Sequence, residues 1–319
     1  MTGIVAFAGR AMGSPLRLQV ATAARATPRP ERLWARVQAE FRTSEAELSC
    51  YRPESALSQL NGTAGSGAWW AASSRLYGFL TMAERAERKS GGRFDARVLG
   101  DLARLGYPGL PAPTARSGPK DSRAARDGAE AGPGWLQRDG RTRRVRVEAP
   151  VDSGGLGKGL TLRWAWRRIE TDLMGRGALL EAGGDLVGRA AAPGGEAWQI
   201  GIEDPLGRPE PLAVVTLSDG AICTSSTARQ RWVDPAGRPA HHLLDPRTGE
   251  PGGAGLLAVT VAGADPGWAE VWSKTLFLAG PTAIGDEARA RGLAVWWVEA
   301  DGTLRMTPAA RQRTIWSAS

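Results

Sequence analysis

Residues 151–173 read VDSGGLGKGLTLRWAWRRIETDL, and this stretch decides how the fold is interpreted. Its second part predicts a helix over Lys158–Leu173, with Gly175 as the stop, because apolar residues recur there every three or four positions. The apolar residues at this spacing are Leu162, Trp166, Ile169 and Leu173. Its first part is rich in glycine and therefore predicts a loop whose backbone can approach a ligand closely.

The glycine-rich loop favours an anionic ligand, most naturally a phosphate, because a helix N-terminus and Lys158 follow it. It is not a Walker A loop, since Asp152 stands five positions before Gly157 and Gly159 replaces the Ser or Thr that would hold magnesium. It also lacks the dinucleotide pattern G-x-G-x-x-G, because Leu160 occupies the last required position. A glycine-rich helix cap without a ligand is the alternative.

Helices and strands alternate irregularly along the rest of the chain, which favours an α+β fold with mixed sheets over a doubly wound sheet. Strands are predicted over Arg17–Val20, Leu179–Ala182, Trp198–Ile202, Ala213–Leu217, Leu256–Ala262 and Leu293–Val298, with a hairpin over Trp135–Ala149 around Asp139-Gly140. Helices are predicted over Pro30–Leu48, Trp69–Lys89, Trp268–Leu278 and Pro281–Arg291. Residues 108–134 lack periodicity and predict a flexible loop.

Composition narrows the class of protein. The 319 residues carry a net charge of +8, largely from Arg, without the concentrated basic and aromatic face of a nucleic-acid-binding protein. With only two cysteines, Cys50 and Cys223, the chain favours a reducing compartment, and a single disulfide between them is the alternative. No apolar run approaches the length of a membrane span, and the N-terminus lacks the features of a signal peptide. We therefore expect a cytoplasmic protein that neither enters a membrane nor binds nucleic acid.

Residues 241–251 read HHLLDPRTGEP and contain both histidines of the chain. Pro246 and Gly249 predict a turn, because proline fixes φ and glycine tolerates a positive φ. Two histidines at one turn favour a site that needs a titratable group. A capped loop with solvent-facing imidazoles is the alternative.

Eight short motifs occur in an order that resembles the ApbE family, the FAD:protein FMN transferases. They are Met12-Gly13-Ser14; Ser49-Cys-Tyr51-Arg-Pro-Glu-Ser55 with Leu60-Asn61; Gly92-Arg-Phe-Asp95; Asp152-Ser-Gly-Gly-Leu-Gly-Lys158-Gly; Glu181-Ala-Gly-Gly-Asp; Thr224-Ser225; His242-Leu-Leu-Asp-Pro-Arg-Thr-Gly; and Ala269-Glu-Val-Trp-Ser-Lys274. The resemblance runs from about residue 11 to 305. It implies one large ApbE-like domain, related to the T-fold, over 11–307, with an N-terminal extension at 1–10 and a C-terminal tail at 308–319.

The resemblance also implies site residues. The positions that match contacts to FAD are Met12, Tyr51, Phe94, Asp95, Asp152, Lys158 and Leu244. Gly155 matches a position whose backbone carbonyl binds the metal, and His242 matches a histidine implicated in the transfer. For Tyr51 and Phe94, plain core packing is the alternative.

One departure concerns the metal. Where the family has Asp and, four residues later, Thr as ligands, this chain has Glu270 and Lys274. Glutamate can bind Mg²⁺, but an ammonium has no lone pair to donate. Lys274 can instead pair with Glu270 one helical turn away, or replace the cation and contact the diphosphate of FAD. We therefore expect a weaker dependence on magnesium.

The implied reaction is transfer of FMN from FAD to a Ser or Thr hydroxyl in the flavinylation motif of an acceptor protein, with release of AMP. Lys158 would stabilise charge on the diphosphate, and His242 would take the hydroxyl proton. The alternatives are hydrolysis of FAD to FMN and AMP by a pyrophosphatase, and an FAD-binding protein with an altered metal site.

Overall fold

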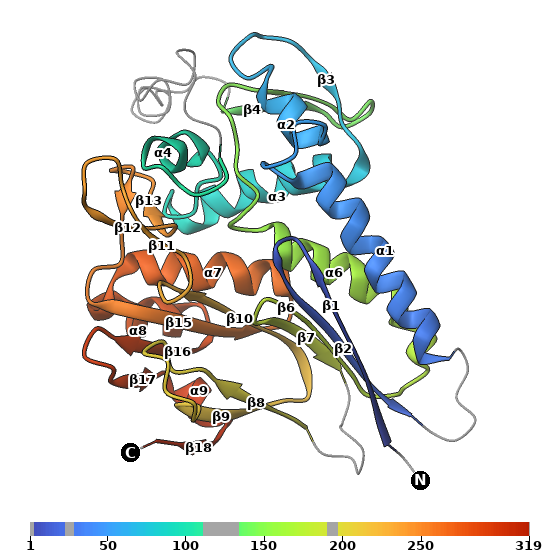
Figure 1. Ribbon diagram of the computed structural model, residues 1–319, viewed down its shortest axis with the longest axis vertical. Helices are drawn as coiled ribbons and strands as arrows, with labels where there is room; N and C mark the ends of the chain where they lie inside the picture. The colour runs from blue at the N-terminus through green and yellow to red at the C-terminus, as the bar shows by residue number, and fades with distance from the viewer. Residues whose placement is uncertain (1–2, 23–28, 111–133, 190–196, 319) are drawn as a thin grey trace. The chain divides into compact units, whose positions relative to one another are not determined.

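The computed structural model describes residues 3–22, 29–110, 134–189 and 197–318, and the chain forms two compact units (Figure 1). Unit 1 contains Met1–Thr43, Lys158–Ala228 and Ala254–Ser319. Unit 2 contains Ser44–Gly157 and Arg229–Gly253. Most of the loop predicted at 108–134 lies outside the described residues.

Unit 1 is built on an eight-stranded sheet in which every neighbouring pair is antiparallel. In spatial order its strands are β1 (Gly3–Ala11), β2 (Ser14–Thr22), β6 (Ala178–Ala182), β7 (Asp185–Arg189), β10 (Asp219–Ser226), β15 (Leu256–Gly263), β16 (Ala294–Glu299) and β17 (Leu304–Met306). The predicted α+β class with packed helices is confirmed, and the described sheets are antiparallel instead of mixed.

Helices cover one face of this sheet (Figure 1). Strand side chains alternate between faces, so Leu180 of β6 packs with the helices while Leu179 points to the opposite face. The helices of unit 1 are α1 (Pro30–Leu48, of which 44–48 belong to unit 2), α6 (Gly157–Ile169, of which Gly157 belongs to unit 2), α7 (Pro266–Ala279), α8 (Pro281–Ala290), α9 (Pro308–Arg311) and the 3₁₀ turn Thr171–Leu173. The short helix α9 is the exception, because its Ala310 packs in the core on the opposite face of the sheet. The apolar stripe predicted at 158–173 lies in this core.

A second sheet packs on the opposite face. Its strands, in the order β18 (Thr314–Ser317), β9 (Ala213–Leu217) and β8 (Trp198–Ile202), bury Trp198 and Leu217 against Trp296 of β16. Unit 1 is therefore layered as helices, large sheet and small sheet.

Unit 2 combines short helices with small antiparallel sheets. Its elements are α2 (Ala56–Asn61), β3 (Trp70–Ala71), α3 (Ser74–Ser90), α4 (Leu99–Arg104), β4 (Leu136–Asp139), β5 (Arg144–Val147), β11 (Arg231–Val233), β12 (Pro239–His241), β13 (Leu244–Asp245) and β14 (Glu250–Pro251). The hairpin predicted at 135–149 is the β4–β5 pair.

Several boundaries differ from the sequence prediction. The helix predicted to end at Leu173 ends at Ile169, and Thr171–Leu173 forms a separate 3₁₀ turn. Helix α3 begins at Ser74 instead of Trp69, because the Ser73 hydroxyl caps it and residues 70–71 pair with β5. The segment interpreted as an N-terminal extension forms β1, and the expected tail contributes α9 and β18. No described helix is long and apolar enough to cross a membrane.

Candidate functional site

The two histidines lie at a short hairpin of unit 2. His241 ends β12, and β13 and β14 then pair on either side of the predicted turn. Gly249 has φ of 71°, and a Cβ there would lie 2.7 Å from Oδ1 of Asp101. The backbone N–H of Gly249 donates to the Asp245 carbonyl at 2.8 Å. The predicted turn is confirmed, and glycine is required in it.

The His241 and His242 side chains are buried to a similar degree. His241 pairs with Arg231 across β11 and β12, and burial, followed by the charge of Arg231, lowers the pKa of His241. His242 is also half-buried and follows the strand directly. Leu244 is buried against Leu102 and Leu105, so its side chain belongs to the small core of unit 2.

Three aromatic side chains of unit 2 form a surface cluster. The Tyr51 and Tyr107 ring centroids are 6.4 Å apart, and the Tyr107 ring meets Trp232 edge-on at 5.0 Å. Tyr51 is 54% exposed, so core packing does not account for it. A flat, exposed aromatic ring of this kind can stack on a nucleotide or flavin ring.

Phe94 and Asp95 lie inside unit 2. The Phe94 side chain is buried, as the core-packing alternative expected. The Asp95 carboxylate accepts hydrogen bonds from the Arg97 guanidinium, including Nε at 2.9 Å to Oδ1 and Nη2 at 2.8 Å to Oδ2. Arg97 also pairs with Glu87 and lies over the Trp135 ring at 5.6 Å. Contacts of Phe94 and Asp95 with FAD stay predictions.

The glycine-rich loop begins at a hydrogen-bonded segment of unit 2. The Asn61 side-chain amide donates to the Val151 carbonyl and accepts from the Val151 N–H, both at 2.9 Å. The Cys50 thiol donates to Oδ1 of Asp152 at 3.5 Å. Burial raises the pKa of Cys50, so it stays a neutral thiol. Both cysteines of the chain are free. Asp152 is half-buried, and Gly155 lies in the turn that precedes α6.

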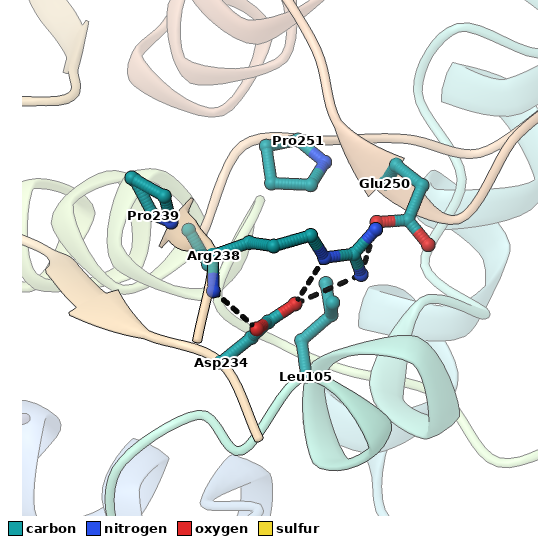
Figure 2. A pocket seen from close by; sticks show the side chains of 7 residues that line it. Leu105, Asp234, Arg238, Pro239, Glu250 and Pro251 are labelled. Atoms are coloured by element: carbon teal, nitrogen blue, oxygen red, sulfur yellow. Dashed lines mark hydrogen bonds and ion pairs between the residues drawn. The ribbon is translucent and has the colours of Figure 1, made fainter. Parts of the chain in front are cut away.

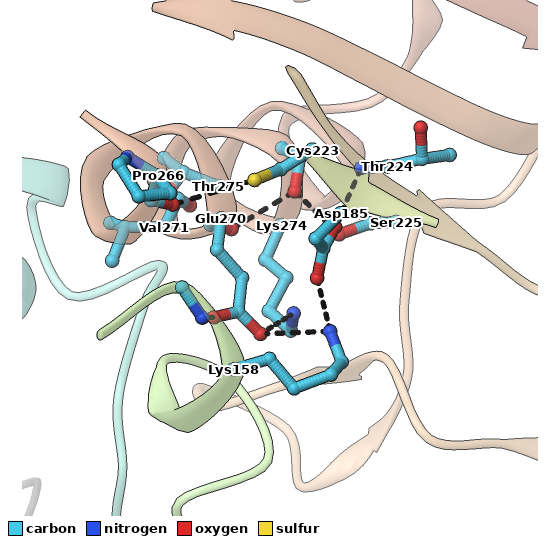
Figure 3. A network of polar contacts seen from close by, with 12 residues as sticks. Lys158, Asp185, Cys223, Thr224, Ser225, Pro266, Glu270, Val271, Lys274 and Thr275 are labelled. Carbon is cyan, nitrogen blue, oxygen red and sulfur yellow. Dashed lines mark hydrogen bonds and ion pairs between the residues drawn. The ribbon is translucent and has the colours of Figure 1, made fainter. Parts of the chain in front are cut away.

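Unit 1 contains a network of buried charges at the first turn of α6 (Figure 3). The Lys158 ammonium donates to Oδ2 of Asp185 and lies 3.3 Å from Oε1 of Glu270. Lys274, one turn along α7, lies 3.4 Å from the same Oε1. The Asp185 and Glu270 carboxylates are 2% and 1% exposed, whereas the Lys158 and Lys274 side chains are 26% and 15% exposed. The ion pair predicted between Glu270 and Lys274 is confirmed.

A backbone N–H also donates a hydrogen bond to each of the two carboxylates. The Gly159 N–H donates to Oε2 of Glu270 at 2.7 Å, and the Thr224 N–H donates to Oδ1 of Asp185 at 3.1 Å. Burial opposes ionisation of Glu270, but Lys158 and Lys274 outweigh it and hold the pKa of Glu270 below its ordinary value. Burial likewise opposes the charge of Lys158, yet Asp185 and Glu270 raise the pKa of that ammonium. Lys158 and Glu270 therefore stay ionised at neutral pH.

Gly159 explains how α6 and α7 come this close. A Cβ at Gly159 would lie 2.5 Å from the Pro266 carbonyl oxygen and 2.8 Å from Cα of Gly267. Only glycine therefore allows the N-terminal turn of α6 to reach the start of α7. This close approach lets the Gly159 N–H reach Glu270.

Met12 lies in the tight turn between β1 and β2. Met12 and Gly13 have φ of 48° and 70°, the geometry of a two-residue hairpin turn. The Met12 side chain is partly buried against the helix-facing core of unit 1. Its contact with FAD stays a prediction.

A divalent cation does not fit the donor set around Glu270. Oε1 already meets two ammonium groups and Oε2 accepts a backbone N–H, while Mg²⁺ needs oxygen lone pairs that Lys274 lacks. Among the described residues there is no group of three or more His, Cys, Asp or Glu that could hold a metal ion.

Unit 2 also has a pocket of about 200 Å³ (Figure 2). Arg238 crosses it between Asp234, at 2.8 Å, and Glu250, at 3.5 Å. Its other lining residues are Leu105, Pro239, Ala240 and Pro251. None of the predicted site residues lines this pocket.

Comparison with known proteins decides the family. The model of the ApbE family matches residues 12–297. The chain belongs to the ApbE family. The FAD:protein FMN transferase of Klebsiella pneumoniae (strain 342) is 28% identical over 304 residues, which cover 92% of this chain and 84% of the relative. The protein of the same name from Salmonella typhimurium (strain LT2) is 27% identical with the same coverage.

Solved ApbE structures share the fold. The flavinyl transferase ApbE of Pseudomonas stutzeri, in its apo form, has a TM-score of 0.80 at 24% identity and covers 99% of this chain and 98% of its own. The ApbE protein of Thermotoga maritima also has a TM-score of 0.80, at 22% identity, covering 98% of this chain and 99% of its own.

Sequence reasoning missed the part played by Asp185. It appeared only as the last residue of the motif Glu181-Ala-Gly-Gly-Asp, in which the glycines alone were interpreted. The signal was an acidic residue directly after paired glycines at the start of a strand, where a buried carboxylate needs a cation. That cation is Lys158.

Proposed function

We propose that this chain is an FAD:protein FMN transferase, which moves FMN from FAD to a Ser or Thr hydroxyl of an acceptor protein and releases AMP. The observation that best supports this reaction is similarity, over 92% of the chain, to relatives named FAD:protein FMN transferase. The charge network around Lys158 supports the way in which the chain would perform it.

The reaction is a phosphoryl transfer. The acceptor oxygen attacks the phosphorus nearest riboflavin, the bond from that phosphorus to the bridging oxygen breaks, and AMP leaves with the electron pair. The hydroxyl proton passes to a base. Because charge moves along the diphosphate, catalysis depends on positioning and on cations near its oxygens.

Lys158 is assigned to a diphosphate oxygen. Its ammonium is ionised and partly exposed, and Asp185 and Glu270 fix its direction. The N-terminal end of α6, where Lys158 lies, adds a partial positive charge. Other contacts with FAD are proposed for Met12, Tyr51, Phe94, Asp95, Asp152 and Leu244. We assign no step to Mg²⁺ or to the ligand pair Gly155 and Glu270, because a divalent cation does not fit the Glu270 donor set.

His242 is assigned as the base that accepts the hydroxyl proton. His241→Gln provides a matched control, because it removes the neighbouring imidazole of similar burial. We expect His242→Gln to lower transfer by about 10²- to 10⁴-fold, the usual contribution of a general base. We expect the affinity for FAD to stay unchanged in both variants and transfer to persist in His241→Gln.

The assay follows acid-stable flavin fluorescence on a denatured acceptor protein after incubation with the full chain and FAD. Equal losses in the two variants would contradict the role of His242. Free FMN and AMP with an unlabelled acceptor would indicate a pyrophosphatase, and bound FAD that is never turned over would indicate a binding protein. Either result would overturn the proposed transfer.

A further inference from the structure

Lys274 lies on the face of α7 that carries Glu270, beside Lys158 (Figure 3). Two ammonium groups and two carboxylates make up this network, so its formal charges sum to zero. A cation with two further positive charges would enter a site that is already neutral and would face both ammonium groups. Electrostatics therefore opposes a divalent cation here.

The exposed part of the network is cationic. The carboxylates are almost fully buried, whereas the Lys158 and Lys274 side chains reach solvent. An ammonium has three N–H donors, of which Lys158 uses two and Lys274 one on carboxylates in the described part of the chain. The remaining donors are available to an anion with several oxygens.

We propose that Lys158 and Lys274 together bind the diphosphate of FAD, and that Lys274 makes this binding independent of a divalent cation. The proposal rests on the proposed function, because it takes FAD as the ligand. It deepens that function by assigning to a side chain the charge neutralisation expected of a metal. A merely structural Lys274 would pair with Glu270 and leave the affinity for FAD unchanged.

The experiment measures FAD binding to the full chain by quenching of flavin fluorescence, once in EDTA and once with Mg²⁺. We expect wild-type affinity to agree within about twofold between the two conditions, and Mg²⁺ alone to show no binding by calorimetry. We expect Lys274→Thr to bind FAD about tenfold more weakly in EDTA, as the loss of a charged hydrogen bond predicts. We expect Mg²⁺ to restore much of that loss.

Controls separate the effect from folding and from general charge. Lys89→Thr removes an exposed lysine of α3 and should leave FAD binding unchanged. Riboflavin lacks the diphosphate, so Lys274→Thr should not alter its binding. Lys274→Arg keeps the positive charge and should retain binding in EDTA. If Lys274→Thr does not fold, as judged by thermal melting, Lys274→Met is used in its place.

Two results would overturn the inference: wild-type binding that falls tenfold or more in EDTA, or binding in EDTA that Lys274→Thr and Lys274→Met leave unchanged. These outcomes are distinct from failure of the proposed function. Tight, metal-independent binding without transfer would reject the transferase and keep the inference. Transfer and binding that both need Mg²⁺ would keep the transferase and reject the inference about Lys274.

Discussion

Lys158 contacts both buried carboxylates of the network, so its removal should affect folding as well as FAD binding. We expect Lys158→Met to lower the free energy of unfolding by about 3 kcal/mol, because it leaves buried charge uncompensated. Urea denaturation measures this value. The double variant Lys158→Met/Asp185→Asn should recover part of the loss, since it restores charge balance. A loss below about 1 kcal/mol in the single variant would be inconsistent with this network.

Glu270 gives the network a dependence on pH. Its pKa in the folded chain lies below the ordinary value of 4.5, so the unfolded chain binds the proton more readily. The stability that this group contributes is therefore complete above about pH 5 and is lost as pH falls through its folded pKa. We expect Glu270→Gln to flatten the fall in urea midpoint between about pH 5 and 3. An unchanged slope would show that other carboxylates cause the fall.

The close contact between helices α6 and α7 at Gly159 predicts the effect of a substitution there on stability. Gly159→Ala places a Cβ against the backbone of Pro266 and Gly267, so we expect a loss of about 1–3 kcal/mol in the free energy of unfolding. Gly285→Ala is the control, because Gly285 lies in α8 and its added Cβ would meet nothing within 4 Å. We expect the control to be neutral or slightly stabilising. Comparable losses in both variants would contradict the close-approach argument.

Most elements could be predicted because their signals are local. Helix α1 agrees with the predicted Pro30–Leu48 at both ends, and β9 agrees with Ala213–Leu217. Strand β1 was not predicted, because only its pairing with β2 and the turn between them identify it as a strand. That turn places Met12 at positive φ, which a non-glycine residue rarely adopts. The residues of a single strand do not indicate which other strand it pairs with.

The site was less accessible from sequence than the elements. Lys158 and Glu270 are 112 positions apart, so no spacing rule brings them together. The family resemblance named both residues, and the spacing of Glu270 and Lys274 predicted their ion pair correctly. The contact of Lys158 with Asp185 depends on β7 entering the sheet beside β10, which is a property of topology. Long-range contacts of buried charges therefore came only from the structure.

For the whole molecule, the residues assigned to the reaction come from both compact units. Lys158 and Lys274 belong to unit 1, whereas Tyr51, Asp152 and His242 belong to unit 2. FMN transfer is therefore proposed for the full chain, and its test uses the full chain.

The most direct measurement of that claim is the mass of an acceptor protein after incubation with this chain and FAD, together with the amount of AMP released. We expect an acceptor heavier by one FMN less one water, on a Ser or Thr, with one AMP released per flavin attached. An acceptor of unchanged mass beside equal amounts of free FMN and AMP would contradict it.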